Sequence, residues 1–168
     1  MAKKEKMLKD LFHETLKDIY YAEKKILTAL PKMANAAQSE DLQAAFEKHE
    51  AETTDQVERL EQVFEIVKQP ARGKTCAAIN GIIDEGQEVM KEFKGSAALD
   101  AGLLATVQTV EHYEISRYGT LKAWAEQLGL QRAVSLLDET LEEEKKTDEA
   151  LTKLAKAAVN QQARQAAE

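Results

Sequence analysis

Two glutamates, Glu111 and Glu114, interrupt the apolar face of a predicted helix in the segment VQTVEHYEISRYGTL. Residues at alternating steps of three and four lie on one face of a helix. That face also carries Leu104, Val107, Tyr118 and Leu121. An ionised carboxylate in an apolar core is strongly disfavoured unless a cation neutralises it or a proton returns to it. The two positions therefore indicate either metal ligands or protonated, hydrogen-bonded acids.

Every other long helix that the sequence predicts has a similar polar interruption. The residues at or beside these apolar faces are Glu23 in the first helix, His49, Glu52 and Gln56 in the second, and Glu144 and Asp148 in the last. Glu114 and Glu144 lie fifteen residues to either side of Gly129, which is about 22 Å along a helix that rises ~1.5 Å per residue. Glu23 and Glu52 are likewise equally far from a turn near residue 37 or 38. The two hairpins should therefore place their acids in one layer.

The chemistry of this layer is that of a dinuclear metal site. Five carboxylates would carry five negative charges when ionised, and two divalent ions nearly balance them. Oxygen ligands with one imidazole suit iron or manganese better than the thiolate sets typical of structural zinc. The predicted ligands of two Fe ions, or of two Mn ions, are Glu23, Glu52, Glu111, Glu114, Glu144 and, as a candidate nitrogen ligand, His49. The alternatives for His49 are a hydrogen-bond donor to a ligand, a buried hydrogen-bonded histidine and a surface residue.

Three further polar residues are expected to hold ligands by hydrogen bonds. Gln56 and Asp148 are assigned this role from their positions on the apolar faces, although a plain buried hydrogen bond explains either. Tyr20 lies one turn from Glu23, where it is expected to contact a ligand or pack as an amphipathic tyrosine at a helix interface. Tyr118, one turn after Glu114, has the same two interpretations.

The elements that must position these residues are predicted from helical periodicity. They are a short helix at about 76–93 and four long helices at about 5–34, 40–67, 97–127 and 130–158. Ser39 is expected to cap the second long helix, Gly129 to supply the turn before the fourth, and Pro31 to kink or end the first. A connection of nearly thirty residues lets the second hairpin cross over and pack on the first. We expect one all-α domain over residues 1–168, a four-helix bundle with one long crossover.

Composition limits the class of protein. With 168 residues, 43% of them hydrophobic, and only 7 Gly and 2 Pro, the chain can bury one sizeable helical core. A net charge of −7 disfavours nucleic acid as the main partner, apart from a local exception at the lysines of MAKKEKMLKD. That start lacks the apolar core of a signal peptide, and no run is apolar enough to span a membrane. With a single cysteine, Cys76, these features predict a cytoplasmic protein.

Four segments resemble a known family: DIYYAEKKIL, KHEAETTDQVERLEQVF, VEHYEISRYGTL and LDETLEEEKKTDEALTKLA. They are similar to the YciF-like family of bacterial stress-associated proteins, within the ferritin-like superfamily, over nearly the whole chain. The resemblance implies a dimeric ferritin-like bundle with a di-iron site and a poorly defined biochemical role. It also implies that Glu23 and Glu52 are the carboxylates of the first two helices, that Glu111 and Glu114 match a Glu-x-x-Glu motif, and that Glu144 belongs to the fourth helix.

One departure from the general ferritin-like pattern concerns its Glu-x-x-His motif. Asp55 stands three residues after Glu52, and Thr147 three residues after Glu144, so neither helix has the histidine at that spacing. His49 instead precedes Glu52 by three residues and would approach the site from the opposite side. Both the nitrogen ligand and a ferroxidase activity are therefore open at this point.

Three classes of function are compatible with these features. The first is a dinuclear metal protein that reacts with oxygen or peroxide and needs an external reductant, since the chain has no rubredoxin-like cysteine pair. The second is a non-enzymatic dimeric stress or scaffold protein whose metal or buried acid network is only structural. The third, a DNA protector using the N-terminal lysines, is opposed by the negative net charge. A partner chain could cover part of the apolar face formed by Ile79, Ile82, Ile83, Met90 and Phe93.

Overall fold

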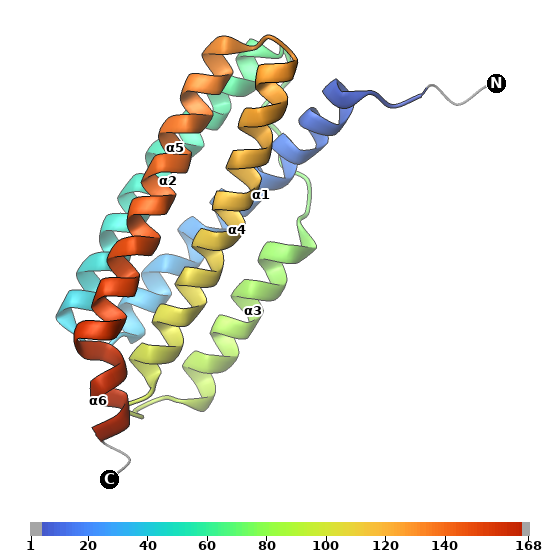
Figure 1. Ribbon diagram of the computed structural model, residues 1–168. Helices are drawn as coiled ribbons and strands as arrows, with labels where there is room; N and C mark the ends of the chain where they lie inside the picture. Colours follow the sequence, from blue (N-terminus) through green and yellow to red (C-terminus); the bar gives the residue numbers. More distant parts are fainter. Residues whose placement is uncertain (1–4, 166–168) are drawn as a thin grey trace.

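The computed structural model describes residues 5–165, and every secondary-structure element in that range is helical (Figure 1). The elements are α1 (Leu8–Ala36), α2 (Glu40–Ile66), α3 (Ala77–Glu92), α4 (Leu99–Gln127), α5 (Gln131–Leu154), a π-helical turn η1 (Ala155–Val159) and α6 (Asn160–Gln165). The long helices α1, α2, α4 and α5 form the bundle, and α3 lies in the crossover beside α1 and α4. The predicted all-α four-helix bundle with one long crossover is therefore confirmed.

The turns within the two hairpins follow the expected local chemistry. The Ser39 hydroxyl accepts a hydrogen bond from the Leu42 N–H at 3.4 Å, which caps α2. Asp100 of α4 reinforces this turn, because its two carboxylate oxygens accept the N–H groups of Gln38 and Ser39, each at 2.8 Å. Gly129 has a φ of 71° between α4 and α5, a left-handed conformation that glycine adopts without a steric cost.

The ends of the outer helices differ from the predicted ranges. Helix α1 begins at Leu8 rather than near residue 5, because the Met7 N–H donates to the Asp10 carboxylate at 2.8 Å and closes its first turn. Pro31 does not end this helix, which continues to Ala36 with Met33 buried against the core. Beyond α5, the chain remains helical to Gln165 instead of stopping near 158, although α6 buries none of its residues. Lys3, Lys4 and the last three residues lie outside the described residues.

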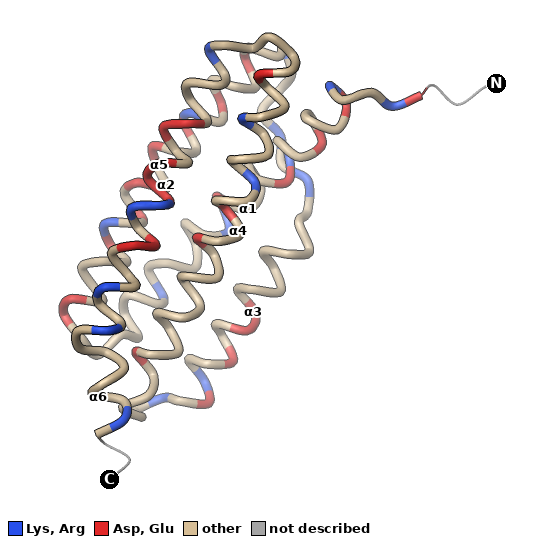
Figure 2. Tube along the Cα trace, viewed as in Figure 1, with Lys and Arg blue, Asp and Glu red and all other residues tan. Residues whose placement is uncertain are grey.

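Helix α4 is the most enclosed of the long helices. It packs against α5, α1 and α3, and Figure 2 shows few charged positions along it, whereas charges of both signs mark α2 and α5. Close approach of α3 depends on Gly86, where an added Cβ would lie 2.7 Å from Thr106 Cγ2 and 2.8 Å from Met33 Cε. The buried face of α3, with Ile79 and Ile83, therefore covers its own bundle.

None of the helices in residues 5–165 combines the length and apolar composition that a bilayer-spanning segment needs.

Candidate metal centre

Four buried side chains from three helices meet in the bundle core. His49 of α2, Glu111 and Glu114 of α4, and Glu144 of α5 each offer one ligand atom, and these four atoms all lie within 4.8 Å of one another. None of the four residues is more than 1% exposed. His49 Nε2 lies 3.0 Å from Glu111 Oε1 and 3.9 Å from Glu114 Oε2. One imidazole nitrogen and three carboxylates thus converge where a single cation could contact all of them.

Local sequence explains how these side chains reach one point. Glu111 and Glu114 are three residues apart on α4, so both project from the same side of that helix. The Gly129 turn reverses the chain and brings Glu144 to the level of Glu114, while His49 enters from α2, which packs against α5. Glu114 and Glu144 are equally far from the Gly129 turn along the chain, and their carboxyl groups therefore lie close together in space.

Glu23 of α1 adds a fourth buried carboxylate to this layer. Its side chain is fully buried, and the Tyr118 hydroxyl of α4 donates a hydrogen bond to Glu23 Oε1. Glu23 Oε2 has no hydrogen-bond partner among the described residues. Burial raises the pKa of Glu23 to about 8, with a further contribution from the negative charge of Glu144. One oxygen of Glu23 thus accepts a hydrogen bond from Tyr118, and the other remains available to a cation.

Burial is also the largest influence on the other acids and on the histidine. It raises the pKa of Glu111, Glu114 and Glu144, and neighbouring carboxylates raise it further for the first two. It lowers the pKa of His49 to about 4, with a smaller contribution from Lys48. Both directions disfavour the charged form, so burial without a cation favours protonated acids and a neutral imidazole.

The buried polar atoms of this layer are poorly satisfied by protein groups. Those without a hydrogen-bond partner among the described residues include both oxygens of Glu111, both oxygens of Glu114, Glu144 Oε2, and both ring nitrogens of His49. The His49 Nε2 atom is close to Glu111 Oε1 but is not aligned for a hydrogen bond. Buried polar groups nearly always have a partner. The layer therefore fits a bound cation when its acids are ionised, or carboxyl groups that bond to one another, Glu23 to Glu114 and Glu111 to Glu144, when they are protonated.

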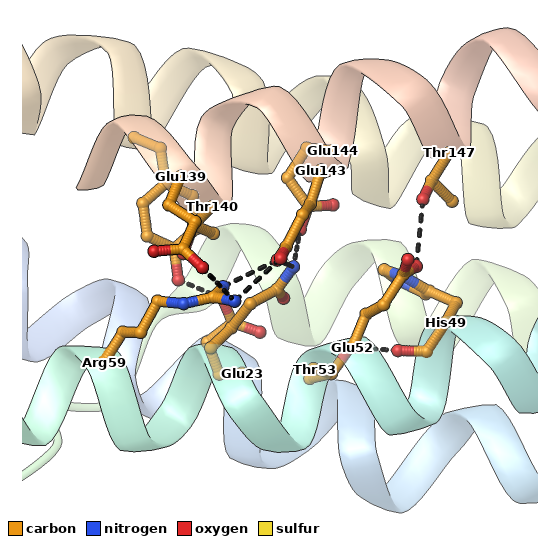
Figure 3. Close-up of polar contacts among 12 residues, drawn as sticks. Glu23, His49, Glu52, Thr53, Arg59, Glu139, Thr140, Glu143, Glu144 and Thr147 are labelled. Carbon is orange, nitrogen blue, oxygen red and sulfur yellow. Dashed lines mark hydrogen bonds and ion pairs between the residues drawn. The ribbon is translucent and has the colours of Figure 1, made fainter. Parts of the chain in front are cut away.

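Gln56 lies beside the layer and contacts a candidate ligand, as the sequence predicted. Its side-chain Nε2 donates to Glu144 Oε1 and, at 3.2 Å, to Glu143 Oε2. Arg59 holds Glu143 from the other side through two hydrogen bonds of 2.6 and 2.7 Å, one to each carboxylate oxygen (Figure 3). The Arg59–Glu143 pair is not among the contacts predicted from the sequence. The available signal was Arg59 three residues after Gln56, on nearly the same side of α2.

Glu52 lies outside the group of four. Its side chain is 25% exposed and pairs with Lys48 one turn earlier on α2. Thr147 of α5 donates its hydroxyl to Glu52 Oε2 at 3.3 Å (Figure 3). The structure therefore brings Glu52 to the edge of the layer rather than to the point where the four ligand atoms meet.

Asp148 and Tyr20 have partners outside the candidate ligands. Asp148 Oδ1 lies 3.1 Å from both Gln108 Nε2 and His112 Nε2, in the interface between α4 and α5. The Tyr20 hydroxyl donates to Glu61 at 2.7 Å. The tyrosine that reaches the layer is Tyr118, for which the sequence left both a ligand contact and simple packing open.

The fold and the site together define a class: an all-α four-helix bundle whose core holds a layer of buried carboxylates and one histidine. The sequence matches the family described as Domain of unknown function (DUF892) over residues 7–164, and the chain belongs to this family. It is 46% identical over 159 residues to the protein YciF of Escherichia coli K12, a match that covers 94% of this chain and 96% of YciF. The resemblance to the YciF-like family is therefore confirmed.

Two solved structures have the same fold. The crystal structure of the E. coli stress protein YciF matches with a TM-score of 0.88 and 46% identity, covering 93% of this chain and 99% of that one. The structure of YcfI from Rhodopseudomonas palustris, described as a candidate structural protein, matches with a TM-score of 0.86 and 44% identity. That match covers 90% of this chain and 97% of YcfI.

Proposed function

We propose that this chain is a dinuclear metal-binding protein of the bacterial stress response, with a pair of iron or manganese ions in its bundle core. The observation that carries the proposal is the convergence of four buried ligand atoms within 4.8 Å of one another, together with the unsatisfied oxygens around them. The assignment to stress response rests on similarity to YciF, which is described as a stress protein.

The two ion positions have unequal ligand sets. His49, Glu111, Glu114 and Glu144 would hold the first ion, because their ligand atoms already lie together. Glu23, with one free buried oxygen, would hold the second ion together with shared carboxylates of the same layer. A pair of redox-active ions, when bound, supplies electrons for the reduction of oxygen or peroxide. The chain's own contribution is to hold these oxygens in place and to exclude bulk water.

Two hydrogen bonds fix the orientation of the ligands in this proposal. Tyr118 holds one oxygen of Glu23, and Gln56 holds one oxygen of Glu144, so in each carboxylate the other oxygen is free for a cation. Ligand carboxylates that are themselves hydrogen-bonded lose less conformational freedom when a metal binds. Glu143 accepts a hydrogen bond from the Gln56 amide, and Arg59 in turn donates to Glu143.

Metal stoichiometry tests this proposal. Protein purified without added metal or chelator, and protein incubated anaerobically with ferrous ion, should contain about two ions per chain. Two divalent ions balance the charge of the four buried acids Glu23, Glu111, Glu114 and Glu144. Replacing Glu114 by Ala should remove both ions, because its carboxyl group belongs to the group of four and is also within hydrogen-bond reach of Glu23. Wild-type protein that remains metal-free after ferrous loading would refute the proposal.

The second candidate is a non-enzymatic dimeric protein in which the acid layer, with or without metal, is structural. The observation that favours it is the raised pKa of all four buried acids, which lets the layer remain neutral without metal. The description of YcfI as a candidate structural protein is compatible with it. Peroxide-dependent oxidation of the loaded protein, measured with an external reductant present, distinguishes the two: turnover supports the first candidate and its absence the second.

We also propose a homodimer, in keeping with the YciF-like resemblance. The buried part of the α3 face is used within the chain, but Phe93 at its end is 43% exposed. Met7 and Leu11, at 58% and 51% exposure, form a second apolar area at the start of α1, which projects away from the other helices (Figure 1). The start of α1 is therefore the better candidate for an interface between two copies.

A further inference from the structure

Three partly exposed carboxylates surround the buried layer, and they differ in how firmly they are held. Glu143 is 24% exposed and bonds through both oxygens to Arg59, whose own side chain is only 13% exposed. Asp148 is 24% exposed and lies between Gln108 and His112. These two acids are each held by groups of neighbouring side chains.

Glu52 is the loosely held member of the three. Its cationic partner, Lys48, is 67% exposed, and a single pair of this kind on a helix surface stabilises a protein only slightly. Its other bond is the 3.3 Å contact with the Thr147 hydroxyl. An incoming cation can therefore replace Lys48 at Glu52 at little cost, while the Arg59–Glu143 pair stays closed.

The position of Glu52 connects solvent with the buried ligands. It is one turn after His49 on α2, and Thr147, to which it bonds, is three residues after Glu144 on α5. Glu52 thus spans the contact between α2 and α5 with a proposed ligand on each of the two helices close by (Figure 3). His49 Nδ1 and Glu144 Oε2 are both buried and without a hydrogen-bond partner among the described residues. A partly exposed carboxylate therefore lies near buried polar atoms that are able to bind a cation.

We propose that Glu52 is a capture carboxylate, which binds a hydrated divalent cation between α2 and α5 and transfers it to His49 and Glu144, in competition with Lys48. This inference rests on the proposed metal-binding function. It assigns Glu52 to the rate of metal uptake rather than to the ions bound at equilibrium. A carboxylate at the mouth of a site raises the local cation concentration and speeds association by about 10-fold to 1000-fold.

Stopped-flow uptake of cobalt(II) by the full-length metal-free protein tests the inference, with visible absorbance reporting both the rate and the final stoichiometry. Glu52→Gln should keep the wild-type stoichiometry but take up cobalt about tenfold more slowly. Lys48→Gln should take it up faster, because it removes the competing ammonium group. Glu58→Gln, which removes the same charge from an exposed position of the same helix, should match the wild type in both measurements.

The other outcomes are equally decisive. Wild-type uptake rates in Glu52→Gln overturn the capture role, and so does a lower final stoichiometry, which would make Glu52 a ligand at equilibrium. The opposite response of Lys48→Gln provides a second measurement that does not depend on how the Glu52 variant folds, and an unchanged rate there counts against the inference. If the wild type itself binds no cobalt and no ferrous ion, the proposed metal site fails, and the inference fails with it.

Discussion

Replacing Glu23 by Gln should stabilise the metal-free protein at neutral pH. In the folded chain, burial and then the charge of Glu144 raise the pKa of Glu23 from 4.5 to about 8. The unfolded chain loses this proton near pH 4.5, so between pH 4.5 and 8 the unfolded state binds fewer protons than the folded state. The free energy of unfolding of the wild type therefore falls as pH rises through this window, and the contribution is fully present only below it.

The size of this effect follows from the same shift. Each pH unit within the window costs about 1.4 kcal/mol, which amounts to about 3 kcal/mol between pH 4.5 and pH 7. A glutamine cannot ionise, and its amide oxygen can still accept the hydrogen bond from the Tyr118 hydroxyl. The Glu23→Gln variant should therefore gain about 3 kcal/mol on the wild type between these two pH values.

Urea unfolding of chelator-treated protein at several pH values measures this difference. Glu58→Gln serves as a matched control for the loss of one exposed carboxylate. The negative charge of Glu23 also raises the pKa of Glu111 and Glu114, so the difference between wild type and variant reports Glu23 together with its effect on these neighbours. A difference in unfolding free energy that stays constant from pH 4.5 to pH 8 would refute the argument, since it would mean that Glu23 ionises alike in both states.

Three further predictions concern the ligands and the oligomer. His49→Ala should weaken binding of at least one ion by about tenfold or more in a metal titration, and two ions retained at wild-type affinity would remove the histidine from the site. Gln56→Leu should lower metal affinity about 10-fold to 100-fold, since the lost side-chain N–H orients Glu144; equal affinity in Gln56→Leu and wild type would show that this hydrogen bond is irrelevant to binding. Leu11→Lys should shift the protein to monomer mass in light scattering and Phe93→Lys should not, whereas the reverse result would place the interface at α3.

The sequence predicted the axial position of the site because two simple quantities determine it. The phase of the apolar pattern decided that Glu111, Glu114 and Glu144 face inward, and the number of residues to the Gly129 turn decided their depth. Both quantities depend on a single hairpin, so packing between the two hairpins changes the predicted depth of these residues very little. The same reasoning placed Glu23 correctly within the core, since it lies on the apolar face of α1 between Ile19 and Ile26.

The helix ends were less predictable because local signals compete with packing there. Pro31 lacks the backbone donor that would extend a helical hydrogen-bond ladder, yet α1 continues past it with Leu30 and Met33 both buried. Burial of these two side chains outweighs the loss of one hydrogen bond. Ala155 and Val159 likewise keep the chain against the bundle beyond the predicted end of the last helix.

The edge of the site could not be predicted, because exposure there depends on how two helices are rotated against each other. Glu52 is three residues from His49, which places it about 60° around α2, so a modest rotation decides whether its carboxylate enters the core or reaches solvent. The Gln56–Glu144 and Arg59–Glu143 contacts between α2 and α5 fix that rotation, and Arg59 and Glu143 both look like solvated charges in the sequence. With the rotation fixed in this way, Glu52 stays partly exposed beside Thr147 of α5, which is the position that its proposed role in cation capture requires.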